Sequence, residues 1–128
     1  MPPPRESLIT PQLLDALATK ESRKNPKAVG DRGKAIGEYQ MWKIAYEDVQ
    51  QFFPQEFGAI PYARLKTDRV LQRRAAEAYL QVGEQKYGIT DFDRLVSFYN
   101  RGPKARAGTI TNQGYVDDVK RLLRGGDP

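Results

Sequence analysis

Five stretches of this chain place apolar residues at helical spacing, and Gly or Pro separates each stretch from the next. They cover residues 10–24, 41–53, 67–88, 91–100 and 112–125. Residues 25–40 lie between the first two and hold three Gly and one Pro, which predicts turns or a small hairpin with Ala35 and Ile36 extended. Residues 54–66 remain ambiguous. The pattern predicts a mainly α (α+β) fold with about five helices and a small β-hairpin or loop region.

The length of 128 residues favours a single domain. Residues 1–9 are Pro-rich and have no packing pattern, so we expect a flexible N-terminal tail followed by one domain over residues 10–128. Thr10 and Pro11 are typical of a helix start, as N-cap and first helical residue. No apolar run approaches the roughly 20 residues of a membrane span, and the N-terminus has no apolar core of a secretory signal. We therefore expect neither feature in this chain.

The sequence contains no Cys and no His. Thiol nucleophiles, disulfides, Ser-His-Asp relays and nearly every zinc or transition-metal site are thereby excluded. Any acid–base chemistry must use Asp, Glu, Lys or Tyr. We expect no metal and no cofactor.

The net charge of +5 favours an anionic partner, and nucleic acid, anionic membranes and acidic cell-wall polymers all satisfy that condition. The best nucleic-acid candidate is a basic stripe formed by Arg64, Lys66, Arg69, Arg73 and Arg74. Asp68 and Glu77 interrupt this stripe, and no nucleic-acid-binding motif accompanies it. We therefore expect no nucleic-acid partner.

Glu21 is an unusual carboxylate for its position. On a helical wheel it falls among the apolar positions of Leu13, Leu14 and Leu17. A half-buried carboxyl has a raised pKa, which suits a general acid. The Gly-rich segment that follows places Glu21 at the rim of a cleft rather than under a continuous core. A frayed, solvated helix end or a pairing with Lys is the alternative interpretation.

Several motifs occur in a fixed order along the chain. Residues 21–22 read Glu-Ser, residues 25–29 Asn-Pro-Lys-Ala-Val and residues 37–41 Gly-Glu-Tyr-Gln-Met. Further along, residues 98–103 read Phe-Tyr-Asn-Arg-Gly-Pro and residues 115–119 read Tyr-Val-Asp-Asp-Val. Together they resemble the catalytic domain of lytic transglycosylases of the soluble (SLT) type, in the lysozyme-like superfamily, over roughly residues 12–123. Glu38 and Phe98 depart from the family pattern.

The resemblance implies a lysozyme-like fold that cleaves the β-1,4 bond between N-acetylmuramic acid and N-acetylglucosamine in peptidoglycan, leaving a 1,6-anhydro end. It implies catalytic roles for Glu21, as general acid and then base, and for Tyr99, as the partner that holds or polarises Glu21. It implies substrate contacts for Ser22, Gln40, Asn100 and Tyr115. Each of these four also has a structural interpretation: Ser22 and Asn100 as helix ends, Gln40 as a loop brace and Tyr115 as core.

Two alternatives stay open beside the transglycosylase. One is a hydrolytic lysozyme-like muramidase, in which Asp31 or Glu38 positions water; Asp31 is otherwise a turn residue and Glu38 a solvent-facing one. The other is a glycan-binding or structural module without activity.

We expect Met41 and Trp42 in the core. We also expect a monomer acting on peptidoglycan strands in the periplasm or cell wall, exported or delivered by a phage or secretion system.

Overall fold

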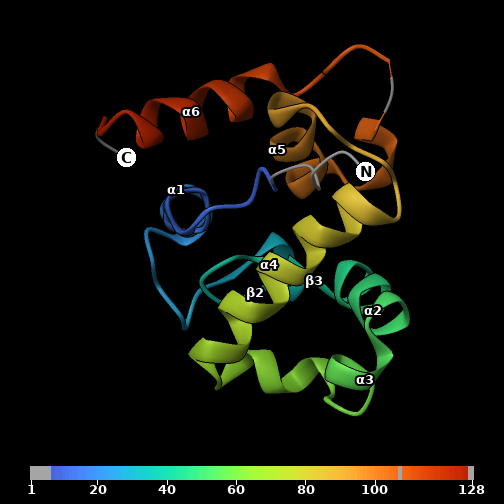
Figure 1. Cartoon of the computed structure of the whole chain (residues 1–128). Coiled ribbons are helices and arrows are strands. Elements are labelled where there is room, and N and C mark those ends of the chain that lie inside the picture. The colour runs from blue at the N-terminus through green and yellow to red at the C-terminus, as the bar shows by residue number, and fades with distance from the viewer. Residues whose placement is uncertain (1–6, 107, 127–128) are drawn as a thin grey trace.

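A computed structural model describes residues 7–106 and 108–126. Within these ranges the structure has six α-helices and a three-stranded antiparallel sheet (Figure 1). The helices are α1 (Pro11–Ser22), α2 (Lys43–Phe52), α3 (Pro54–Phe57), α4 (Arg69–Gln85), α5 (Phe92–Arg101) and α6 (Gln113–Leu123). The strands are β1 (Val29–Gly30), β2 (Ala35–Ile36) and β3 (Met41–Trp42), and three short 3-10 turns span Asp31–Gly33, Tyr62–Lys66 and Pro103–Arg106. The predicted mainly α class with a small β region is confirmed.

The first helix begins where the sequence predicts. The Thr10 hydroxyl accepts a hydrogen bond from the Leu13 backbone N–H at 3.1 Å, and Pro11 follows at the first helical position. Leu13 and Leu17 are fully buried, because α1 packs against both α6 and α4. The helix ends at Ser22, since Arg23 adopts the left-handed conformation. Glu21 therefore lies in the last turn of a helix that two other helices hold in place.

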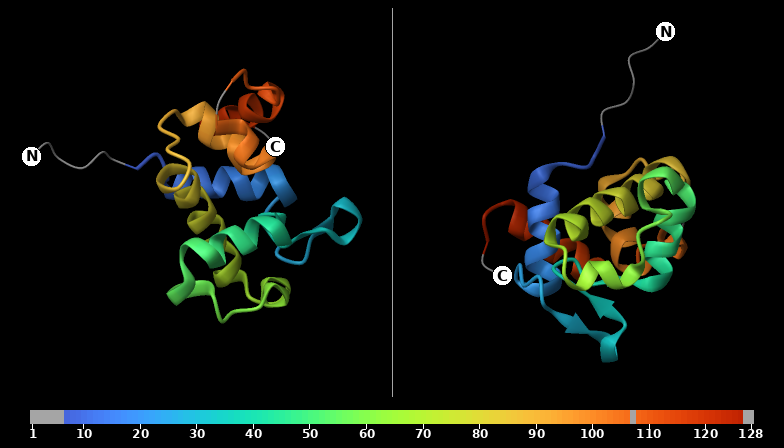
Figure 2. Two further views of the ribbon diagram at one scale, coloured as in Figure 1. Left: turned by 90° about the vertical axis from the view of Figure 1, so that its right-hand side faces the viewer. Right: turned by 90° about the horizontal axis from the view of Figure 1, so that it is seen from below.

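The Gly-rich segment forms the sheet, and the strand order is β1-β2-β3. Ala35 and Ile36 are extended as predicted, and Ala35 pairs with Trp42 in the antiparallel register. The expected start of the second helix at residue 41 is wrong, because pairing with β2 extends Met41 and Trp42 into β3. Figure 2 shows the sheet and its turn projecting beyond the helices.

The ambiguous segment 54–66 contains α3 and the turn Tyr62–Lys66. It leads to Asp68, which caps α4 by accepting a hydrogen bond from the Leu71 N–H at 3.0 Å. Helix α4 packs against α2 and α5, and its side chains fill the centre of the hydrophobic core. This arrangement fixes β3, α2 and α5 around one end of α1.

The N-terminal residues that the structure describes are attached to the domain. The Ser7 hydroxyl and the Leu8 N–H each donate to the Glu84 carboxylate at 2.9 Å, and Leu8 and Ile9 pack against the core. Residues 1–6 of the expected tail lie outside the described residues. No helix in the described ranges combines the length and apolar character that a membrane crossing requires.

Candidate active site

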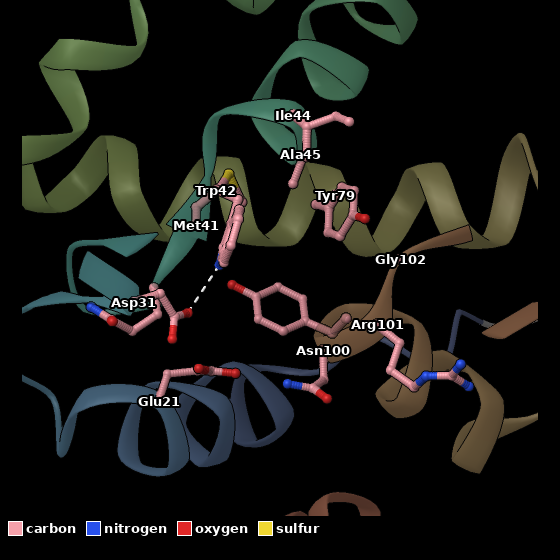
Figure 3. Close-up of a pocket in the computed structure, with 12 residues that line it drawn as sticks. Glu21, Asp31, Met41, Trp42, Ile44, Ala45, Tyr79, Asn100, Arg101 and Gly102 are labelled. Carbon is pink, nitrogen blue, oxygen red and sulfur yellow. Dashed lines mark hydrogen bonds between the residues drawn. The ribbon is translucent and has the colours of Figure 1, made fainter. Parts of the chain in front are cut away.

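A cavity of about 350 Å³ opens between the end of α1, the sheet, the start of α2 and the end of α5. Figure 3 shows Glu21 entering it from α1, with Asp31 and Trp42 facing it from the side of the sheet. The lining residues include Glu21, Asp31, Gln40, Trp42, Tyr99 and Asn100. Four of the six site residues predicted from the sequence therefore meet in one cavity.

Burial raises the pKa of Glu21 from 4.5 to about 7. The main cause is loss of solvation, and the negative charge of Asp31 acts in the same direction. A hydrogen bond from Tyr115 and the charge of Lys20 oppose the shift without cancelling it. Glu21 also lies in the last turn of α1, where the helix dipole disfavours an anion. Near neutral pH this carboxyl can therefore both give up and take back a proton.

Tyr115 on α6 holds Glu21 in place. Its hydroxyl donates a hydrogen bond to Glu21 Oε2. Burial, together with the neighbouring Glu21 charge, raises the Tyr115 pKa well above its usual value, so the phenol stays protonated and remains a donor. Because Oε2 is engaged by this hydrogen bond, Oε1 is the oxygen available to hold the proton of the neutral carboxyl.

Tyr99 does not take the position that the resemblance implied. Its hydroxyl donates to the Tyr39 carbonyl at 2.8 Å rather than to Glu21, and its ring packs edge-on against Tyr79 at 5.9 Å between ring centres. Tyr99 thus forms a wall of the cavity and ties α5 to the turn before β3. The partner of Glu21 is instead Tyr115, which lies 94 positions along the chain.

Gln40 and Asn100 both line the cavity, Gln40 from the turn before β3 and Asn100 from the last turn of α5. The Gln40 Nε2 donates to the Gly37 carbonyl at 2.9 Å, so this amide braces the turn as well as facing the cavity. The Asn100 Oδ1 accepts a hydrogen bond from Asn112 Nδ2 at 3.0 Å. Each residue combines a structural contact with a place on the cavity surface.

Ser22 is not among the residues that line the cavity. Its hydroxyl donates to the Glu38 carbonyl at 2.6 Å and accepts from the Asn25 N–H at 3.0 Å. These contacts tie the end of α1 to the turn before β3. The structure therefore gives Ser22 a bracing position, one of the two interpretations that the sequence left open.

The two further carboxylates lie in different surroundings. Asp31 lines the cavity, and its Oδ2 accepts a hydrogen bond from Trp42 Nε1 at 3.1 Å (Figure 3). Glu38 is only 7% exposed and forms an ion pair with Arg69 at 2.9 Å. The expected solvent-facing position of Glu38 is therefore wrong, because the folded turn directs its carboxylate toward α4. Asp31 is therefore the only carboxylate besides Glu21 among the described residues that line the cavity.

Trp42 is a cavity residue that the sequence interpretation missed. It was expected in the core with Met41, yet it is 41% exposed and its ring forms part of the cavity surface, while Met41 is buried. Lys34 lies 5.7 Å from the centre of this ring. The short β3 strand explains the difference, since successive residues of a strand point to opposite faces.

Comparisons of this chain with protein-family models, characterised proteins and solved structures return no match. Among residues 7–106 and 108–126 no three carboxylates gather in a way that could hold a metal ion.

Proposed function

We propose that this protein is a lytic transglycosylase that cleaves the bond between N-acetylmuramic acid and N-acetylglucosamine in peptidoglycan. The observation that carries the proposal is Glu21, a half-buried carboxyl in an open cavity with a pKa of about 7 and a fixed phenol partner. A group of this kind can act as acid and then as base within one turnover. The resemblance of the sequence motifs to the SLT family implies the same role for Glu21.

In the first step the neutral Glu21 donates the proton on Oε1 to the glycosidic oxygen. The bond from that oxygen to C1 breaks, and the N-acetylglucosamine portion leaves with a hydroxyl group. Positive charge develops at C1, and the 2-acetamido group of the muramic acid stabilises it. Glu21 is now an anion, which the hydrogen bond from Tyr115 and the positive charge of Lys20 stabilise.

In the second step the C6 hydroxyl of the muramic acid attacks C1. Its proton passes to Glu21, and a new C1–O bond closes the 1,6-anhydro ring. No water is consumed, and Glu21 returns to its neutral form. A single carboxylate is sufficient for the whole cycle.

The cavity also has features suited to a polysaccharide. The Trp42 ring offers a flat surface for a sugar face, and the Gln40 and Asn100 amides can bond N-acetyl groups. A neighbouring hollow of about 520 Å³ shares Ile44, Ala45, Tyr79, Arg101 and Gly102 with the cavity. The two hollows therefore lie next to each other, and a glycan strand bound in the cavity would extend toward the second hollow.

A hydrolytic muramidase is the second candidate, and Asp31 is the observation that favours it. Asp31 lies in the same cavity as Glu21 and could position a water molecule. Its carboxylate is already engaged by the Trp42 indole, which gives it a structural task. Digestion of purified peptidoglycan distinguishes the candidates, because the anhydro product is one water lighter than the hydrolytic one.

Neutralising Asp31 provides a test with a matched control. We expect Asp31→Asn to retain cleavage within about fivefold of the wild type, and the products to remain anhydro-ended. Glu38→Gln makes the same charge change outside the cavity, and we expect it to lower stability by weakening the Arg69 pair while retaining cleavage. The turnover of both variants is measured on one peptidoglycan preparation. A loss of about a thousandfold for Asp31→Asn alone, with hydrated products, would assign a two-carboxylate hydrolase.

The raised pKa of Glu21 predicts how cleavage depends on pH. The acid must be protonated before it reacts, so kcat/KM should fall as the pH rises through about 7. Because the Asp31 charge raises the Glu21 pKa, the Asp31→Asn variant should show this fall at lower pH. Initial rates between about pH 5 and pH 9 measure both profiles. A wild-type profile that stays flat across this range would mean that Glu21 is not the acid.

A further inference from the structure

The positive charge of this protein is concentrated in one segment. Residues 23–43 carry six cations and two carboxylates, a net +4 of the chain's +5. The six cations are Arg23, Lys24, Lys27, Arg32, Lys34 and Lys43, and all are exposed. We call the surface that they form over the sheet and its flanking turns the basic lobe. It is the part that projects from the helices in Figure 2.

The cations of the basic lobe lack the acidic partners that occur elsewhere. Eight ion pairs are present in the described residues, and none involves any of the six. The cations of α4 show the contrast, since Arg69, Arg73 and Arg74 each pair with a carboxylate. Of the two acids within the lobe, Glu38 is neutralised by Arg69 and Asp31 faces the cavity. Self-repulsion disfavours such a surface unless an anion approaches it.

The basic lobe borders the cavity directly. Lys34 lies over the ring of Trp42, which lines the cavity, and Arg32 follows Asp31, which also lines it. Lys43 begins α2 immediately after Trp42. A polymer whose sugars occupy the cavity would therefore have its substituents beside these cations.

We propose that the basic lobe binds the carboxylates of the peptide stems that a peptidoglycan strand carries. This inference rests on the proposed function and extends it from the reacting bond to the substituents of the strand. The six cations lie at separate positions along the sheet and its flanking turns, from Arg23 after α1 to Lys43 at the start of α2, which suits several carboxylates along a polymer rather than one small anion. The lobe raises the local concentration of the strand and favours strands that bear peptides over bare glycan.

Binding to peptidoglycan sacculi, measured by co-sedimentation, tests the proposal. The protein carries Glu21→Gln so that the polymer stays intact, and the sacculi are freed of phosphodiester polymers. The lobe variant adds Lys34→Gln and Lys43→Gln; the control adds Lys66→Gln and Arg124→Gln, which remove the same charge from exposed positions elsewhere. At low salt we expect the lobe variant to bind about tenfold more weakly and the control less than twofold more weakly. Coupling a neutral amine to the carboxylates of the sacculi should remove the difference.

Equal losses of binding for the lobe variant and the control variant would overturn the proposed role of the basic lobe, because net charge alone would then explain binding. Unchanged binding to carboxyl-blocked sacculi would also overturn it. Tighter binding to phosphodiester polymers or to anionic vesicles than to the sacculi would assign another partner. The proposed function fails separately: a protein with Glu21 intact that binds through the lobe but releases no products would retain the docking surface and lose the enzyme assignment.

Discussion

Replacing Glu21 by Gln is expected to reduce peptidoglycan cleavage by about a thousandfold or more, while the fold and the affinity for the glycan remain. Gln has nearly the same shape and can still accept the Tyr115 hydrogen bond, yet it can neither give nor take a proton. The rate of product release from purified peptidoglycan measures the loss, and binding by the variant controls for folding. Appreciable turnover by a folded variant would show that another residue is the acid.

The same substitution should stabilise the protein at alkaline pH. The folded-state pKa of Glu21 is raised from 4.5 to about 7, so its contribution to stability is present below pH 4.5 and is lost as the pH rises through about 7. The loss amounts to on the order of 3 kcal/mol. Denaturant unfolding at pH 5 and pH 8 should show this decline for the wild type and not for Glu21→Gln. Equal declines in the two proteins would mean that Glu21 is solvated.

Replacing Tyr115 by Phe is expected to reduce cleavage by roughly 10- to 100-fold, the second largest effect. The substitution leaves the ring in place and removes only the hydroxyl that donates to Glu21 Oε2. Two consequences follow: the carboxyl loses its fixed orientation, and its anion loses a donor. Tyr115 is a positioning residue, so the loss should appear mainly in kcat.

The pH profile separates this role from a merely structural one. Because the Tyr115 hydrogen bond lowers the Glu21 pKa, its removal should move the alkaline fall in rate to higher pH. Tyr99→Phe is the matched control, since that hydroxyl donates to the Tyr39 carbonyl instead of Glu21. We expect Tyr99→Phe to lower stability and leave the pH profile unchanged. If Tyr99→Phe moved the pH profile and Tyr115→Phe did not, Tyr99 rather than Tyr115 would be the residue that positions Glu21.

Local rules predicted much of the fold because they act over a few residues. Thr10 and Pro11 define the start of α1 through one hydrogen bond and one fixed backbone angle. The apolar stripe of α1 placed Glu21 on a buried face, and the structure confirms that Glu21 is largely withdrawn from solvent. Periodicity alone carries this information, since a helix repeats every 3.6 residues.

Contacts between distant elements could not be predicted in this way. The hydrogen bond from Tyr115 to Glu21 depends on how α6 packs against α1, and the Glu38–Arg69 pair depends on how the turn between β2 and β3 lies beside α4. The prediction of Trp42 in the core is wrong because Met41 and Trp42 fit the helical pattern of the residues after them, whereas pairing with β2 makes both residues extended. In each case a tertiary contact decides the side chain's surroundings.

The mass of the products from purified peptidoglycan tests the central claim most directly. The wild-type protein is incubated with sacculi, and the soluble muropeptides are analysed by mass spectrometry, with Glu21→Gln as the blank. A lytic transglycosylase must yield muropeptides with 1,6-anhydro ends, each one water lighter than its hydrated counterpart, and these should form from the first time points. Hydrated ends in their place would contradict the account and assign a hydrolase, and an absence of Glu21-dependent products would contradict it altogether.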